Sequence, residues 1–144
     1  MKLTDIKELK LFCESLHSNP SWREVLENVQ RGENDFEIDN VRFIETDHIQ
    51  EALEDYLASD TYTLGCFTAW SISEATGWPV ELIEAAQKGE QYEAIGNAMT
   101  GEHIAQLASI YASSDGYGHA FNGYDFSEEE LHINECIYHV FDNR

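Results

Sequence analysis

Residues 113–125, SSDGYGHAFNGYD, combine three glycines, three aromatic residues, a histidine and two aspartates. His119, Asp115 and Asp125 could supply nitrogen and oxygen ligands to a metal ion. Ser113 or Ser114 could also act as a nucleophile, with His119 as its general base and an aspartate to orient the histidine. The stretch is therefore typical of three kinds of loop: a catalytic loop, a metal-binding loop, or a recognition loop.

The patterns that usually accompany metal or covalent chemistry are missing from the sequence. There is no HxxxH, HExxH or GxxxxGK[ST] motif, and the oxygens after Asp115 do not follow the EF-hand spacing. Cys13, Cys66 and Cys136 are far apart and include no CxxC pair, so they predict reduced, mostly buried thiols. We expect no metal, no cofactor and no enzyme activity. The alternative is an enzyme or metal-binding protein that uses His119, Asp115 and Asp125.

As a recognition loop, the same stretch has two interpretations. Its glycines permit turns that are closed to other residues, and Tyr117 and Tyr124 provide rigid amphipathic contact area. These tyrosines could anchor a partner protein. Alternatively, the aromatic rings pack inward and the loop only connects the last helix to the last strand.

The charge distribution is the most informative property of the sequence. The formal net charge is −20, from 28 acidic and 8 basic residues. Between Phe43 and Asn143 there are 19 acidic residues, and Lys88 is the one cation. Such unrelieved negative charge opposes compaction, so stability does not explain it. It predicts a partner with a positive surface, unless it records a solubility bias or adaptation to high salt.

The periodicity of apolar residues predicts the elements that position these groups. Helical spacing with caps and terminal glycines predicts helices over residues 4–16, 19–29, 46–57, 61–77, 78–99 and 101–114, and Gly89 could kink or divide the helix over 78–99. Alternation predicts a β-hairpin over about 35–45, turning at Asp39-Asn40, and a C-terminal strand over about 131–141.

These elements predict a single α+β domain over residues 1–144. It is mainly helical, with five or six helices and a three-stranded antiparallel sheet formed by the hairpin and the C-terminal strand. No signal peptide and no apolar run long enough for a membrane are present. We therefore expect a cytoplasmic protein with no membrane partner.

Four stretches resemble small uncharacterised proteins of bacteriophages and other mobile elements: FEIDNVRFI, LGCFTAW, QKGEQYEAIG and DGYGHAFNGYD. The resemblance covers most of the chain after residue 33 and implies a setting in a bacterial host cell, but it carries over no catalytic residue. In charge, though not in motif, the chain is also similar to DNA-mimic inhibitors. These include antirestriction proteins, some anti-CRISPR proteins and the phage inhibitor of uracil-DNA glycosylase.

The sequence therefore predicts a non-enzymatic inhibitor that mimics nucleic acid. It would occupy the cleft of a basic nucleic-acid-binding host protein and would not itself bind nucleic acid, whose phosphates require clustered Lys and Arg. The alternative binding function is that of an immunity or antitoxin protein that neutralises a basic nuclease. The expected binding residues are Glu51, Glu54, Asp55, Asp60, Glu81, Glu84, Glu90, Glu93, Tyr117 and Tyr124.

Overall fold

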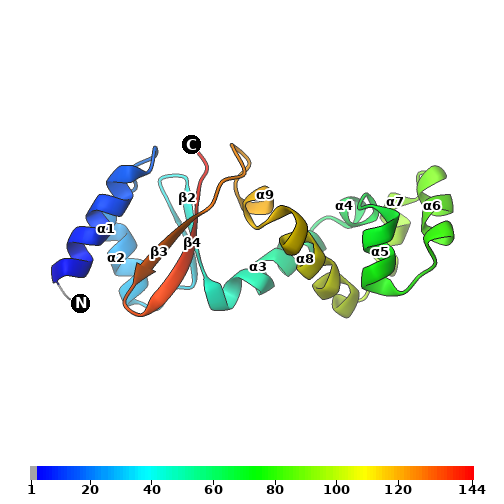
Figure 1. The fold of residues 1–144 in the computed structure, drawn as a ribbon, viewed down its shortest axis with the longest axis horizontal. Coiled ribbons are helices and arrows are strands. Elements are labelled where there is room, and N and C mark those ends of the chain that lie inside the picture. The colour runs from blue at the N-terminus through cyan, green and yellow to red at the C-terminus, as the bar shows by residue number, and fades with distance from the viewer. Residues whose placement is uncertain (1–2) are drawn as a thin grey trace. The chain divides into compact units, whose positions relative to one another are not determined.

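The computed structural model describes residues 3–144, and these divide into two compact units (Figure 1). The sheet unit consists of the described part of Met1–Ile49 together with Tyr117–Arg144. The helical unit is the continuous segment Gln50–Gly116. Among the described residues, no helix is long and apolar enough to cross a membrane.

The sheet has four antiparallel strands in the order β1-β2-β4-β3. These are β1 (Asp35–Ile38), β2 (Val41–Glu45), β3 (Glu129–Ile133) and β4 (Cys136–Asp142). The α+β class is confirmed. The predicted three-stranded sheet is wrong, because the C-terminal strand expected over 131–141 is a second hairpin.

Each hairpin turns through two residues with positive φ. Asp39 and Asn40 have φ of 51° and 70°, which confirms the predicted first turn. Asn134 and Glu135 have φ of 52° and 65° and reverse the chain between β3 and β4. Two consecutive residues with positive φ are characteristic of the type I′ turn, whose twist matches that of the flanking strands.

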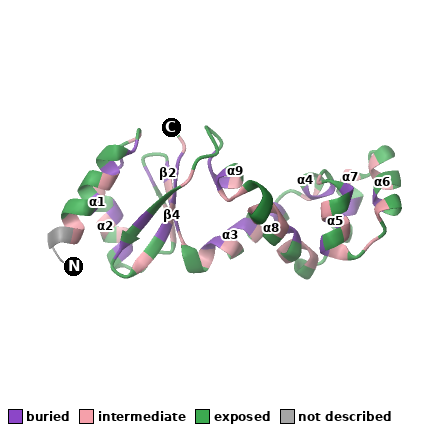
Figure 2. Ribbon diagram, in the orientation of Figure 1, coloured by how far each residue is buried: buried purple, intermediate pink, exposed green. Residues whose placement is uncertain are grey.

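Two helices of the sheet unit, α1 (Leu3–Ser15) and α2 (Trp22–Gln30), share a hydrophobic core with the strands. Figure 2 shows the buried residues along β2 and β4. The main members of this core are Leu9, Cys13, Val25, Val29, Val41, Phe43, Leu131, Tyr138 and Val140. The Tyr138 hydroxyl donates to the Glu33 carbonyl at 3.1 Å, so the buried ring keeps a polar partner.

The described residues contain nine helices, so the predicted five or six is also wrong. The expected helix over 61–77 is α4 (Thr61–Gly65) and α5 (Ala69–Thr76). The chain bends between them because Thr68 starts a new helix, accepting a hydrogen bond from the Ser71 backbone at 3.2 Å. The predicted end of the helix over 61–77 is correct, because Gly77 follows α5 and has φ of 80°.

The expected helix over 78–99 is likewise divided, into α6 (Val80–Lys88) and α7 (Tyr92–Ala98). Gly89 follows α6, and Glu90 has φ of 58°, which no continuous right-handed helix permits. The remaining helices are α3 (Thr46–Ala58), α8 (Gly101–Asp115) and the short α9 (Gly118–Phe121).

Candidate functional site

The shortage of cations belongs to the helical unit. Residues 50–116 contain eleven acidic residues and one cation, Lys88, a net charge of −10. The sheet unit also has a net charge of −10, but from seventeen acidic and seven basic residues. Residues 117–143, although they contain no Lys or Arg, therefore fold together with the basic residues of the N-terminal segment.

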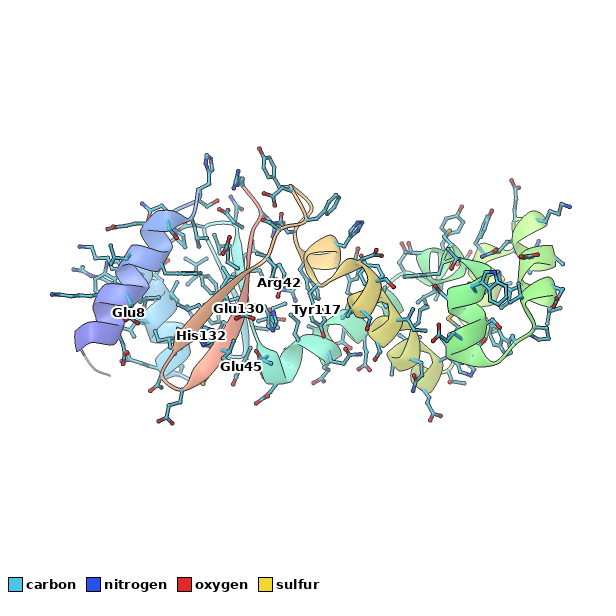
Figure 3. The ribbon with its side chains drawn as sticks, viewed as in Figure 1. Glu8, Arg42, Glu45, Tyr117, Glu130 and His132 are labelled. Atoms are coloured by element: carbon cyan, nitrogen blue, oxygen red, sulfur yellow. The ribbon has the colours of Figure 1, made fainter. Side chains whose placement is uncertain are left out.

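Opposite charges are paired in the sheet unit. The Arg42 guanidinium donates to both Asp35 carboxylate oxygens, at 3.0 and 2.8 Å, and lies 4.7 Å from the Phe121 ring centre (Figure 3). This bidentate pair raises the pKa of Arg42, chiefly through its hydrogen bonds to Asp35. Arg144 lies 3.8 Å from Asp125. The sheet unit therefore carries ion pairs at Arg42 and Arg144 in addition to its net negative charge.

The acidic residues on and after α3 have different environments. Glu51 and Asp55 are exposed, and Glu54 is half-buried. Asp60 caps α4, because its carboxylate accepts from the Thr63 backbone at 3.2 Å and from the Thr63 hydroxyl at 2.7 Å. These hydrogen bonds lower the pKa of Asp60. Asp60 therefore has a structural task as well as a charge.

The acidic residues of α6, α7 and the turn between them have no comparable structural task. Glu81, Glu84, Glu90 and Glu93 are all exposed. Within residues 5–144, the structure gives these four side chains no ion pair and no hydrogen bond. Lys88 is exposed on the same helix as Glu84. This group, which we call the α6–α7 acidic face, is the part of the predicted site most available to a partner.

Large apolar side chains are exposed in the same unit. Trp70 is 74% exposed and Leu82 is 62% exposed, and Tyr56 and Tyr62 are also exposed. The sequence predicts Trp70 as part of a central buried helix. It is exposed because the break after α4 leaves α5 with a buried face at Ala69, Ile72 and Ala75. The helical unit thus combines negative charge with aromatic and aliphatic contact area.

The segment from Tyr117 to Ser127, which we call the aromatic loop, is held together by hydrogen bonds within itself. Asn122 is fully buried, and its amide nitrogen donates to Asp125 at 2.8 Å and to the Ser127 carbonyl at 2.9 Å. Its side-chain oxygen accepts from the backbone of Tyr124 at 3.1 Å. Asn122 is the organising residue that the sequence analysis missed, although an Asn followed by Gly is a familiar turn signal.

The two tyrosines expected to bind a partner belong to the sheet unit. Tyr117, labelled in Figure 3, is half-buried, and its ring makes an edge contact with the His139 ring, with 5.6 Å between the ring centres. His139 Nδ1 in turn hydrogen-bonds to Glu128. Tyr124 is 61% exposed, and the Arg144 guanidinium lies 5.1 Å from its ring centre. The eight predicted carboxylates all lie in the helical unit, so the structure does not unite the predicted residues in one unit.

The structure divides His119, Asp115 and Asp125, the residues expected for a metal site or an enzyme, between the two units. Asp115 ends α8 in the helical unit, whereas His119 and Asp125 belong to the sheet unit. The His119 ring stacks on Phe126 at 4.3 Å. Among the described residues, no three His, Cys, Asp or Glu side chains form a group that could hold a metal ion.

Two of the three cysteines lie where a thiolate is disfavoured. Burial, and then Glu14, raise the pKa of the Cys13 thiol to about 11. Burial, and then Glu45, raise the pKa of Cys136. Cys66, which the sequence places in an apolar segment, is exposed. The thiols of Cys13 and Cys136 are therefore protonated at neutral pH, and a protonated thiol is a poor nucleophile.

Comparisons of the chain with protein families, curated proteins and solved structures found no match. The candidate site therefore rests on the residues themselves.

Proposed function

We propose that the protein is a non-enzymatic inhibitor, of the anti-CRISPR or antirestriction kind, that mimics nucleic acid and blocks a basic nucleic-acid-binding protein. The observation that carries the proposal is the α6–α7 acidic face in a unit with eleven acidic residues and one cation. Its carboxylates are exposed, and among residues 5–144 none of them forms an ion pair.

The physical basis is an electrostatic likeness to a nucleic acid. DNA presents closely spaced negative charges along its axis, and proteins that bind it place Lys and Arg against them. Glu81 and Glu84 are three residues apart on α6, and Glu90 and Glu93 have the same spacing across the start of α7. Residues three apart on a helix are neighbours on its surface, so Glu81 and Glu84 would offer a basic cleft two successive negative charges. Glu90 lies in the turn before α7 and Glu93 in the first turn of that helix, and they add two more exposed charges.

Such a complex forms quickly and depends on salt. Opposite fields steer the partners together, and added salt screens this attraction. The exposed Trp70 and Leu82 would add apolar contact that salt does not screen. We therefore expect binding that weakens with salt but does not vanish.

The test is capture of partners from a bacterial lysate on the immobilised protein, with elution by increasing salt and identification by mass spectrometry. A captured partner is then purified and loaded with a fluorescent DNA or RNA duplex. The expected result is a basic nucleic-acid-binding protein that releases its duplex when this protein is added. Partners that are neutral and insensitive to salt, or a duplex that stays bound, would contradict the proposal.

Two variants separate a local face from overall charge. In the first, Glu81, Glu84, Glu90 and Glu93 are all changed to Gln. In the second, four exposed acids of α1 and α2 are changed to Gln instead: Glu8, Glu14, Glu24 and Glu27. Both variants lose four negative charges. The first is expected to release the duplex at least about tenfold less effectively, a loss of about 1.4 kcal/mol in binding, and the second is expected to resemble the wild type. Equal losses would show that only net charge matters.

A further inference from the structure

We propose that the groove between α6 and α7 binds an amphipathic helix whose polar face carries Lys and Arg. This inference deepens the proposed function and rests on it, because it specifies which part of a basic partner the protein holds. It concerns the helical unit alone.

The groove is lined almost entirely by apolar side chains. Its lining residues are Trp78, Leu82, Ile83, Ala86, Gln91, Ala94, Ile95 and Ala98. Ile83 and Ile95 are buried and form its floor, whereas Leu82 is 62% exposed at its edge. The alanines leave room that larger side chains would fill. A groove of this composition leaves apolar surface in contact with water. Binding of a partner that covers this surface is therefore favourable.

The groove is open to solvent, since Leu82, Gln91 and Ala94 in its lining are exposed. The hollow has a volume of about 280 Å³. Pockets for small molecules usually enclose about 300–1,000 Å³ and bury most of the ligand. A groove between two helices is instead a common seat for the apolar face of a third helix, which inserts residues spaced three or four apart.

The charges around the groove specify the polar face of that helix. Glu81 precedes Leu82 on α6, and Glu93 precedes Ala94 on α7, so both helices that line the groove carry exposed carboxylates and the docked helix would meet a negative field. Glu90 is exposed in the turn that joins the two walls. A helix with apolar residues toward the groove and Lys or Arg on its flanks is complementary to this arrangement, whereas an acidic helix is repelled.

The direct test uses three fluorescent 18-residue peptides and measures anisotropy. The first has Leu and Lys at helical spacing, the second has the same residues in scrambled order, and the third has Glu in place of Lys. The expected result is that the first binds at least about tenfold more tightly than the other two, a difference of about 1.4 kcal/mol. Equal binding of the first two peptides would overturn the inference, because it would show attraction by charge alone.

Variants locate the binding on the protein. Leu82→Ser combined with Ala94→Gln changes exposed residues of the groove and is expected to weaken binding of the first peptide at least about tenfold. The matched control is Leu11→Ser, since Leu11 is 65% exposed and lies on α1 in the sheet unit. The control is expected to bind as the wild type does. Unchanged binding by the groove variant would overturn the inference.

Two further measurements keep this inference distinct from the proposed function. Sedimentation velocity of the protein alone is expected to give a monomer. If it gives a dimer that Leu82→Ser dissociates, a second copy fills the groove, and this result would overturn the inference. In the duplex-release assay, the groove variant is expected to be impaired. Normal release by that variant would overturn the groove inference and leave the proposed function standing. If the peptide binds in the groove but the protein releases no duplex, the proposed function is contradicted and the groove inference stands.

Discussion

The α carbon of Gly96 lies so close to the Thr61 carbonyl that a β carbon added there would be 1.8 Å from the carbonyl oxygen. The relationship is reciprocal, since a β carbon on Gly65 would be 1.9 Å from the Tyr92 carbonyl oxygen. Helices α4 and α7 are therefore antiparallel and in direct backbone contact at both ends. This contact anchors α7 within the helical unit and thereby positions one wall of the groove.

Replacement of either glycine by alanine is expected to destabilise the protein. The added methyl group meets backbone rather than a movable side chain, so Gly96→Ala should cost about 3 kcal/mol of unfolding free energy. The control is Gly101→Ala, because a β carbon at Gly101 meets no atom within 4 Å. Denaturation in urea, followed by circular dichroism, measures both. Equal midpoints for Gly96→Ala and Gly101→Ala would show that the two helices do not pack so closely.

Gln87 is expected to be important for joining α6 to the α4–α5 connection. Its amide nitrogen donates to the Gly65 carbonyl at 3.0 Å and to the Phe67 carbonyl at 2.7 Å. Gln87→Glu places a carboxylate against these two carbonyl oxygens and should cost about 2–3 kcal/mol of unfolding free energy. Gln106→Glu on α8, where the side chain is exposed, introduces the same charge and should cost little. The two midpoints in urea should therefore differ, and a common shift would attribute the effect to charge alone.

Asn122→Ala is expected to unfold the aromatic loop. The change removes the amide that joins Asp125 to the Ser127 carbonyl and leaves a small void in place of the buried Asn122 side chain, a loss of about 1–3 kcal/mol. Asn97→Ala removes an exposed amide from α7 and serves as the control. Limited proteolysis should cut the Asn122→Ala protein within residues 113–130 faster than the control. Unchanged cleavage there would contradict the role of Asn122.

The contribution of Asp60 to stability is expected to disappear in acid. Its hydrogen bonds to Thr63 place its pKa in the folded protein below the ordinary value of 3.8. The unfolded chain therefore takes up this proton at a higher pH than the folded chain does. The stabilisation is complete above 3.8 and is lost as the pH falls through the lower folded value.

The measurement is the difference in unfolding midpoint between wild type and Asp60→Ala as a function of pH. The difference should be present near neutral pH and should shrink once the pH falls below 3.8. Asp55→Ala removes an exposed aspartate of α3 and controls for the general effect of losing one charge. A difference that stays constant down to the lowest pH would contradict the capping role.

The three cysteines are expected to react with iodoacetamide in the order of their accessibility. Cys66 is exposed and should react first, and Cys136 should follow. Cys13 should react only in denaturant, because it is buried and its pKa is about 11. Mass spectrometry of timed samples gives the order. Early alkylation of Cys13 would show that α1 opens readily from the sheet unit.

The two hairpins show what apolar alternation could and could not predict. In the first, the apolar positions change from even to odd across Asp39-Asn40, so Ile38 pairs with Val41 and both face the core. The second makes the opposite change, from the odd Leu131 to the even Tyr138. That change of phase was the signal for a turn, but Glu135, unlike Asn40, is not a residue typical of tight turns, so the sequence analysis predicted one strand.

The helical boundaries failed for a different reason. The apolar pattern over residues 61–77 continues through the break at Thr68, whereas Gly89 marked the helix over 78–99 as one that could divide. Contacts between helices also constrain where the chain bends. Gly65 and Gly96 show this well, because each is required by a neighbour distant in sequence. The exposed acids of α6 and α7, by contrast, were predictable, since charged residues are rarely buried without a partner.

The path of the chain through the two units sets an order of events during synthesis on the ribosome. The helical unit is one uninterrupted segment, Gln50–Gly116, whereas β2 of the sheet unit pairs with β4, which ends at Asp142. The helical unit can thus fold while the nascent chain is still growing. The sheet unit must wait for its last strand to leave the exit tunnel, and until then β2 has only β1 as a neighbour.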